Sequence, residues 1–236
     1  MRKFLEEMAG AYAPGKLYAI DFCKGENVAI RNAGLYCKFK IPFVMGSTIM
    51  GDTPAKEAYA QIEKMAEESK TPCVVAPNFD VRLNAWMYGL ECMARDRPGA
   101  FYGALIKLSE SHQKDKINKK TGLPETSGTM RSELKALSLL TGREIIEADI
   151  TCLRSPYVQA EFLKVPEDWI NWHAYHFLKV FNMHDGVLDS EELIFKRHGG
   201  ESYRLGAMLA LDFLADCKNK KYYNTMTDVQ DSKKIK

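Results

Sequence analysis

The 236-residue sequence lacks several features that would place it in a well-marked class of protein. No apolar run is long enough to span a membrane, and the first residues, MRKFLEEMAGAYAPG, lack the apolar segment of a signal peptide. The 33 basic residues are nearly balanced by 31 acidic ones, so the net charge of +2 gives no general attraction to nucleic acid or to an anionic membrane. The expected localisation is cytoplasmic or organelle stroma, with no nucleic acid and no membrane as partner.

Cysteine spacing is equally uninformative about metals. The six cysteines are scattered without a C-x-x-C pair, and several lie in apolar runs, so reduced buried thiols are favoured over disulfides. In HAYHF, His173 and His176 are expected on one side of a strand. With no third ligand suggested, ordinary sheet packing is favoured and no metal site is predicted.

The first half of the chain alternates between short apolar runs and helical patterns. Such alternation predicts a parallel sheet with crossover helices. The predicted strands and the helix that follows each of them are 17–22 then 26–39, 42–46 then 54–69, and 72–76 then 81–95.

The second half shows a different order, which predicts an α+β arrangement with a mixed or antiparallel sheet. The expected strands lie at 101–110, 143–154, 172–181 and 187–198, and the expected helices at 127–142 and 202–219. The predicted fold class is therefore α/β, a truncated Rossmann-type parallel sheet followed by an α+β domain. The predicted domains are a partial dinucleotide-binding domain (1–98), a substrate-binding and oligomerisation domain (99–220), and a C-terminal segment that returns toward the first domain and ends as a polar tail (221–236).

One polar loop, ESHQKDKINKKTGLPETSGT (110–129), separates two apolar elements. Ser127 and Thr129 stand at the predicted start of a helix, where hydroxyls and the first free N–H groups form an anion site. His112 and Lys116 could add a proton source and a positive charge. Taken singly, an N-cap and solvated charge explain these residues as well as a site does. The four residue types together make the two interpretations about equal.

These residues resemble a known family. The pattern ESHQ-x-x-K followed by SGT is similar to the signature of dihydrodipicolinate reductase, especially the plant-type form. Further segments resemble the family in the same order, including LYCKFKIPFVMGST, APNF, PGAFYGALIKLSESHQ, VPEDWINWHAYHF and YYNTMTDV. The resemblance covers nearly the whole chain from Leu17 onward.

The resemblance implies a reaction and a set of site residues. The reaction is the reduction by NADPH or NADH of a cyclic imine or ene-amine dicarboxylate, in the diaminopimelate route to lysine. His112 matches the family's proton-donating histidine, Lys116 its general-acid lysine, and Gln113 a position that contacts substrate. The residues that match the carboxylate-binding segment are Ser127, Gly128 and Thr129; those that match loops along the nicotinamide end of the cofactor are Gly46, Ser47, Thr48, Ala76, Pro77, Asn78 and Phe79.

The sequence also departs from the family pattern. The glycine-rich turn that holds the cofactor pyrophosphate is missing, so weak or absent cofactor binding is expected for this chain alone. The family's GTTGGD turn stands here as GSTIMGD, with Ile49 and Met50 in place of a small residue. The segment INKKTGLPE lengthens the stretch between Lys116 and Ser127.

These departures leave three interpretations open. The chain is a reductase, either with an unusual cofactor grip or with a second chain that supplies the missing nucleotide-binding half, and a homo-oligomer is expected. Alternatively, it is a reductase-derived protein without turnover that acts as a ligand-binding or assembly subunit. The third interpretation is that the reading frame is incomplete at its N-terminus. Retention of His112 and Lys116 favours the first, and loss of the pyrophosphate turn favours the second.

Overall fold

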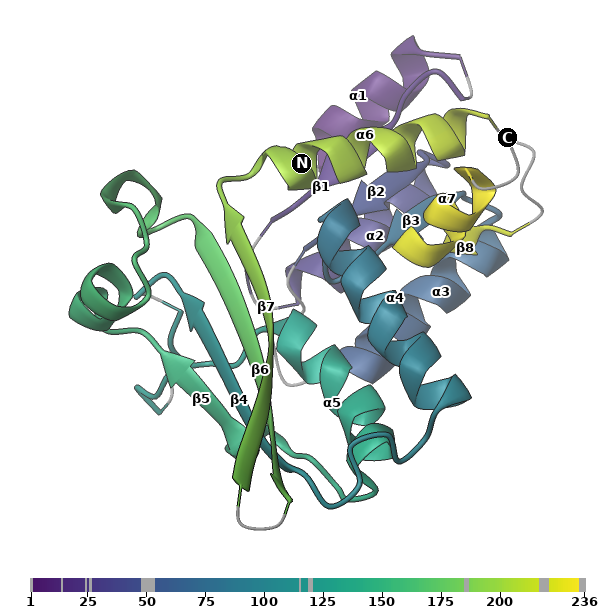
Figure 1. The fold of residues 1–236 in the computed structure, drawn as a ribbon. Coiled ribbons are helices and arrows are strands. Elements are labelled where there is room, and N and C mark those ends of the chain that lie inside the picture. The colour runs from purple at the N-terminus through teal and green to yellow at the C-terminus, as the bar shows by residue number, and fades with distance from the viewer. Residues whose placement is uncertain are drawn as a thin grey trace. The chain divides into compact units, whose positions relative to one another are not determined.

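The computed structural model describes residues 2–13, 15–23, 25, 27–47, 54–114, 116–118, 121–184, 187–216 and 221–233 (Figure 1). It divides into two compact units, one made of Met1–Asn84 with Ser202–Lys236 and the other of Ala85–Glu201. The predicted domain boundary at 98/99 lies within this second unit, and the helix predicted at 202–219 belongs to the first. No described helix is both long and apolar enough to pass through a bilayer.

The first unit is built on a four-stranded parallel sheet in the order β1-β2-β3-β8. The strands β1 (Ala19–Asp21), β2 (Phe43–Met45) and β3 (Cys73–Val75) lie within the three predicted runs, and all residues of β2 and β3 are buried. The helices α2 (Val28–Lys38) and α3 (Ala55–Ser69) connect them, and α4 (Val81–Asp96) follows β3. The predicted parallel α/β arrangement is confirmed.

Both faces of this sheet are covered, because alternate strand residues point to opposite sides. On one face, Phe43 and Cys73 pack against α1 (Arg2–Ala11), α2 and α3. On the other, Val44 and Val74 pack against α6 (Glu201–Ala215) and α7 (Met226–Lys233).

The C-terminal segment predicted at 221–236 joins the first unit over the part of it that the structure describes, and it contains a helix in place of a plain polar tail. Tyr223–Asn224 forms β8, which pairs with β3 in parallel, and α7 follows it directly. Met226 and Val229 are fully buried in the apolar layer of this unit. Two buried apolar residues therefore anchor a helix in an otherwise polar stretch, and the sequence pattern did not predict this helix.

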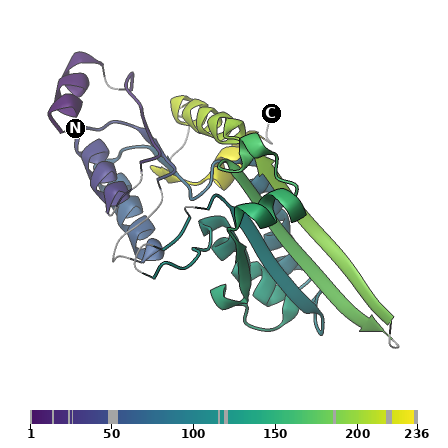
Figure 2. The ribbon, with the colours of Figure 1, turned by 90° about the vertical axis from the view of Figure 1, so that its left-hand side faces the viewer.

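The second unit contains a four-stranded mixed sheet in the order β5-β4-β6-β7. Its strands are β4 (Leu105–His112), β5 (Ile150–Leu153), β6 (His173–His184) and β7 (Val187–His198). β4 pairs with β5 in parallel and with β6 antiparallel, and β6 and β7 form a long hairpin (Figure 2). The predicted mixed or antiparallel sheet is confirmed, although only the last third of the run predicted at 143–154 is strand.

One face of this sheet is covered by α5 (Gly128–Thr141) and the end of α4. Leu108 and Leu178 from the sheet pack against Met130 and Leu137 of α5. The ends of α5 are fixed locally: the Ser127 hydroxyl accepts a hydrogen bond from the Met130 N–H at 3.1 Å, and Gly142 ends the helix with a φ of 69°.

Candidate active site

Three charged or titratable side chains lie on the face of the mixed sheet that α5 covers. Glu110 and His112 are two residues apart on β4 and therefore point to the same side. His176 on β6 pairs directly with Glu110 across the antiparallel ladder. All three are buried, with exposed fractions of 0%, 8% and 1% for Glu110, His112 and His176. The site is therefore built around the carboxyl end of β4.

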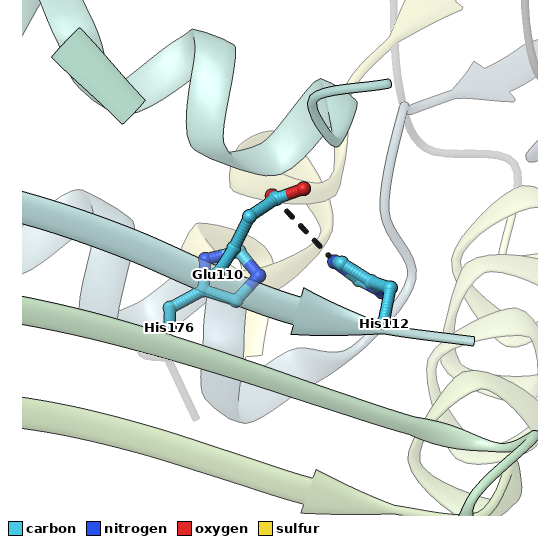
Figure 3. Close-up of side chains that lie close together, drawn as sticks. All are labelled: Glu110, His112 and His176. Carbon is cyan, nitrogen blue, oxygen red and sulfur yellow. Dashed lines mark ion pairs between the residues drawn. The ribbon is translucent and has the colours of Figure 1, made fainter. Parts of the chain in front are cut away.

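The Glu110 carboxylate faces the N-terminal end of α5. The Ser127 N–H donates to both of its oxygens, at 3.2 and 3.1 Å, and the Cys152 thiol lies 3.6 Å from Oε1. Glu110 Oε1 also forms a buried ion pair with Arg154. His112 Nε2 lies 3.7 Å from Glu110 Oε2 (Figure 3). A carboxylate of the protein therefore stands next to the helix end that was predicted to bind an anion.

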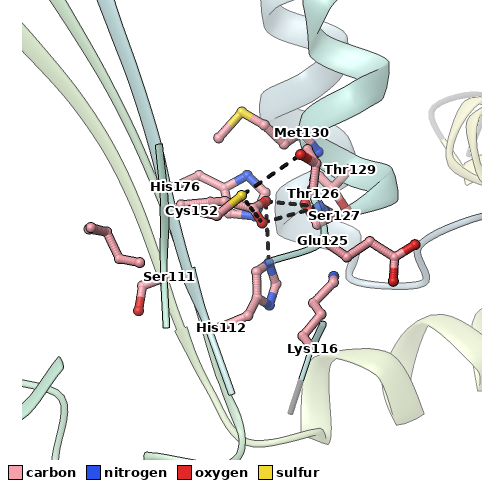
Figure 4. A network of polar contacts seen from close by, with 12 residues as sticks. Ser111, His112, Lys116, Glu125, Thr126, Ser127, Thr129, Met130, Cys152 and His176 are labelled. Carbon is pink, nitrogen blue, oxygen red and sulfur yellow. Dashed lines mark hydrogen bonds and ion pairs between the residues drawn. The ribbon is translucent and has the colours of Figure 1, made fainter. Parts of the chain in front are cut away.

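The lengthened segment between Lys116 and Ser127 folds back as a small hairpin. Ile117 and Pro124 form an antiparallel bridge, and the Glu125 N–H donates to the Lys116 carbonyl at 3.1 Å. The insertion therefore does not carry Lys116 away from α5. Figure 4 shows the ends of the His112 and Lys116 side chains pointing toward Ser127 and Glu125.

Arg154, directly after β5, holds this hairpin against the sheet. Its guanidinium donates to the carbonyl of Lys116 at 3.4 Å, to that of Glu125 at 2.7 Å and to that of Glu110 at 3.3 Å. Since its side chain is only 7% exposed and also pairs with the Glu110 carboxylate, Arg154 ties both ends of the hairpin to β4.

Burial sets the protonation states of the site. It lowers the pKa of Lys116 to about 8, against the pull of the Glu110 charge. Burial, with the Lys116 charge added, lowers the pKa of His112 well below its usual range, so this imidazole is neutral at pH 7. Although burial alone raises the pKa of Glu110, the Ser127 N–H, Lys116 and Arg154 together lower it. At neutral pH the ionisable proton belongs to Lys116, and His112 offers only a neutral ring.

The remaining predicted substrate residues flank this centre. Gly128 and Thr129 form the first turn of α5, and Thr129 is buried. Gln113 directly follows β4, and its carbonyl accepts a hydrogen bond from the Lys116 N–H at 3.1 Å. The structure therefore brings His112, Lys116 and Ser127 into one neighbourhood in the second unit, with Gln113, Gly128 and Thr129 adjacent to them in the chain. Their roles in binding or catalysis stay a prediction.

The expectation that His173 and His176 share one side of the sheet is wrong. They are three positions apart, an odd number, so a strand directs them to opposite faces. His173 Nε2 lies 2.8 Å from the Ser111 hydroxyl, and its Nδ1 lies 2.8 Å from the Ile170 carbonyl oxygen. His176 lies instead on the α5 side, with Nδ1 3.4 Å from Glu133 Oε1.

The predicted cofactor residues lie in the other unit, at the carboxyl edge of its parallel sheet. Gly46 and Ser47 follow β2, and residues 76–79 follow β3, whose last residue pairs with the last residue of β2. This is the edge at which open parallel sheets bind ligands. Thr48, Ile49 and Met50 lie outside the described residues.

Several described groups at this edge are already engaged within the protein. The Gly46 N–H donates to the Asp21 carbonyl at 2.8 Å, and the Ser47 hydroxyl donates to the Asp21 carboxylate at 2.6 Å. The Phe22 ring lies so close to Gly46 that a side chain there would collide with it. Phe22 in turn packs edge-on against Phe79, with ring centroids 5.3 Å apart. Gly46, Ser47 and Phe79 therefore bond and pack within the protein, and their contact with a nicotinamide stays a prediction.

Sequence reasoning missed Glu110, Arg154, Glu133 and His176 as parts of this centre. The signal for Glu110 was available, because a residue two positions before His112 on a strand shares its face. No comparable signal pointed to Arg154 or Glu133, since their contacts depend on how β5 and α5 pack against β4.

Comparison with known proteins agrees with the resemblance. The chain is 32% identical over 202 residues to 4-hydroxy-tetrahydrodipicolinate reductase 2, chloroplastic, of Arabidopsis thaliana, covering 84% of this chain and 53% of that protein. It is 31% identical over 195 residues to a probable chloroplastic 4-hydroxy-tetrahydrodipicolinate reductase 2 of Oryza sativa subsp. japonica, covering 83% of this chain and 54% of that one. The chain belongs to the dihydrodipicolinate reductase family. It spans about half the length of the curated relatives it matches, and no protein-family model matches it.

A solved structure shows the same fold. It is a dipicolinate-bound dihydrodipicolinate reductase from Paenisporosarcina sp. TG-14, which aligns with a TM-score of 0.55 at 18% identity and covers 94% of this chain and 75% of that one. The predicted combination of a parallel sheet with a second, mixed sheet is therefore the arrangement of a dihydrodipicolinate reductase.

Proposed function

We propose that this chain carries the substrate-binding and proton-donating part of a 4-hydroxy-tetrahydrodipicolinate reductase, which reduces a cyclic imine or ene-amine dicarboxylate on the route to lysine. The observation that supports it best is the partly buried, ionisable Lys116 beside the neutral ring of His112 at the start of α5. A lysine whose pKa is about 8 holds a proton at pH 7 and releases it readily.

In this proposal the residues divide the work. One substrate carboxylate binds at Gly128 and Thr129 in the first turn of α5, because the Ser127 N–H already donates to Glu110, and the positive charge of Lys116 attracts the dianion. Lys116 donates the proton to the ring atom next to the one that accepts the hydride. His112 lines the site as a neutral polar side chain, and Gln113 contacts substrate at the edge of the site.

We propose NADPH or NADH as the reductant, as the family resemblance implies. We assign substrate binding and proton donation to this chain, because these are the roles proposed for the residues gathered around Lys116. We expect this chain to bind NADPH weakly by itself, and a homo-oligomer or a second chain to complete the nucleotide site. Submicromolar binding of NADPH, measured by calorimetry on the isolated chain, would contradict this expectation.

The substrate assignment is tested without any cofactor. Calorimetric titration of the full chain with pyridine-2,6-dicarboxylate at pH 7 should show binding, which Lys116→Ala weakens by about tenfold or more, since it removes a charge from a site of low dielectric. Lys114→Ala is the matched control, because Lys114 is exposed two positions away, and it should leave the affinity unchanged. Equal affinities of wild type and Lys116→Ala would refute the placement of substrate beside Lys116.

The second candidate function is binding without turnover, as a ligand-binding or assembly subunit. The packing of Phe22 on Gly46 and the bond from Ser47 to Asp21 favour it, since both use up groups predicted to hold cofactor. Dicarboxylate binding by this chain without consumption of NADPH in the presence of substrate would support this candidate. Consumption of NADPH that depends on Lys116 would support the reductase.

A further inference from the structure

The cluster of Glu110, His112 and His176 has the donor set and the spacing of a metal site (Figure 3). One ligand atom of each residue lies within 4.8 Å of the ligand atoms of the other two. The three positions are fixed by backbone geometry, because Glu110 and His112 alternate on β4 and His176 is the ladder partner of Glu110 on β6. The two imidazole rings stand edge to face with centroids 5.6 Å apart.

Unsatisfied polar atoms give a second, independent reason to expect a ligand here. In the part of the chain that the structure describes, His112 Nε2 and both ring nitrogens of His176 are buried without a hydrogen-bond partner. A buried polar atom without a partner is unfavourable, so such atoms are rare unless something binds them. Two neighbouring imidazoles with unused nitrogens present lone pairs to one small volume.

Two neighbouring carboxylates complete the surroundings that metal-ligating residues usually have. Glu133 Oε1 lies 3.4 Å from His176 Nδ1 without a hydrogen bond between them, so a small rotation would let this carboxylate orient the ring and leave Nε2 for a metal. Arg154 and the Ser127 N–H hold the Glu110 carboxylate, as outer contacts hold a ligating carboxylate. Glu110 Oε2 accepts from the Ser127 N–H at 3.1 Å and lies 3.7 Å from His112 Nε2, and it has a further lone pair for the ion.

We propose that Glu110, His112 and His176 form a binding site for one divalent transition-metal ion of the zinc class, with Glu133 as the residue that positions His176. Two imidazoles and one carboxylate suit Zn²⁺ or Co²⁺ and exclude Mg²⁺ and Ca²⁺, which take oxygen ligands. Bonds of about 2.0–2.2 Å place ligands about 3.3–3.6 Å apart in a tetrahedral site. Small side-chain rotations that draw the three groups together therefore close the site around the ion.

The neighbouring charges define how tightly the ion is held. Lys116 and Arg154 carry positive charge close to Glu110, and they repel a metal ion bound there. Glu110 and Glu133 supply negative charge that attracts the ion. The affinity is therefore expected to be below that of closed cysteine-rich structural zinc sites, and occupancy should follow the free metal concentration.

The test measures metal directly and does not depend on reductase activity. The full chain is stripped with a chelator and titrated at pH 7.5 with Co²⁺ and with Zn²⁺, by visible absorption and by calorimetry. One Co²⁺ per chain with the absorption bands of a four- or five-coordinate ion is expected, and Zn²⁺ should displace it. His176→Gln and Glu110→Gln should abolish the bands, and Glu133→Gln should weaken Co²⁺ binding roughly 10- to 100-fold.

Matched histidine variants separate this site from surface binding. His173→Gln changes a buried histidine on the same strand but on the opposite face, and His198→Gln changes an exposed one; both should bind Co²⁺ like wild type. Thermal melting with and without Zn²⁺ checks the fold of each variant, and Zn²⁺ should raise the melting temperature of wild type and of His173→Gln but not that of His176→Gln. Absence of Co²⁺ binding to wild type, or equal binding by His176→Gln, would overturn the proposal.

Discussion

Arg154 offers the sharpest test of the site's architecture, because one guanidinium joins three segments. It pairs with Glu110 on β4 and donates to the carbonyls of Lys116 and Glu125 at the two ends of the hairpin. Both charged partners are shielded from water, with side-chain exposures of 7% for Arg154 and 0% for Glu110. Arg154→Met replaces the charged side chain with an apolar one of similar length and removes every one of these contacts.

The expected loss of stability follows from the burial of the pair. Removing one partner of a buried ion pair costs about 3–5 kcal/mol in the free energy of unfolding, because the other charge stays buried without compensation. Lys116 remains near Glu110 and offsets part of this penalty, so about 3 kcal/mol is expected. The double variant Arg154→Met with Glu110→Gln should recover part of that loss, since no unpaired carboxylate remains.

Urea unfolding at pH 7, followed by circular dichroism, measures these differences. Arg131→Met is the control: Arg131 pairs with Glu147 at 2.8 Å, but its side chain is 41% exposed. Exposed pairs contribute at most about 1 kcal/mol, so the midpoint of this control should move little. If Arg154→Met lowered the unfolding free energy no more than Arg131→Met, the central role of the buried pair would be refuted.

Four further predictions follow from other parts of the molecule. If the chain turns over, Lys116→Ala should reduce kcat by about 100-fold or more, and wild-type kcat should fall as pH rises through about 8, because the acid loses its proton; a flat profile to pH 9.5 would contradict this. Burial alone would raise the pKa of Asp21, but hydrogen bonds from Ser47 and other donors lower it. Asp21 therefore stabilises the fold above its ordinary pKa, and this stability is lost as pH falls through the lowered pKa. Asp21→Asn should make the free energy of unfolding depend less steeply on pH in acid unfolding experiments. Gly206→Ala should destabilise by about 1–3 kcal/mol although alanine favours helices, because a Cβ would lie 2.8 Å from the Phe79 carbonyl carbon; a higher melting temperature would refute the close packing. Light scattering should show self-association, and a monodisperse monomer would contradict the predicted homo-oligomer.

The first half of the fold could be predicted because its signals are local. Each of the strands β1, β2 and β3 is a short apolar run, and each run is followed by a helix whose apolar residues recur at helical spacing. Parallel pairing follows from that alternation alone. The C-terminal strand β8 could not be found in this way, since a two-residue strand such as Tyr223–Asn224 carries no periodicity and exists only because β3 offers it a free edge.

The candidate site was predictable only along one stretch of chain. His112, Lys116 and Ser127 are close in sequence, and the motif that contains them also resembles the family. The bridge between Ile117 and Pro124, which returns the lengthened segment to the start of α5, was not predictable, because the added residues looked only like extra length. When the two ends of a longer loop pair with each other, the residues that flank the loop stay close together. The length of the segment therefore did not predict how far Lys116 lies from Ser127.

His173 and His176 were misjudged because an odd number of positions separates them, and strand register then decides which of them meets Glu110. Counting along β6 places His173 and His176 on opposite faces, but only the pairing of β6 with β4 decides which of them meets Glu110. A slip of that ladder by one residue would bring Tyr175 or Phe177 opposite Glu110 and would remove His176 from the α5 side. The metal site proposed for Glu110, His112 and His176 therefore depends on a register that no single strand encodes. A disulfide or a spectroscopic distance that measured a different pairing of β4 with β6 would remove the geometric basis for that site, while the hairpin and Arg154 would keep Lys116 beside α5.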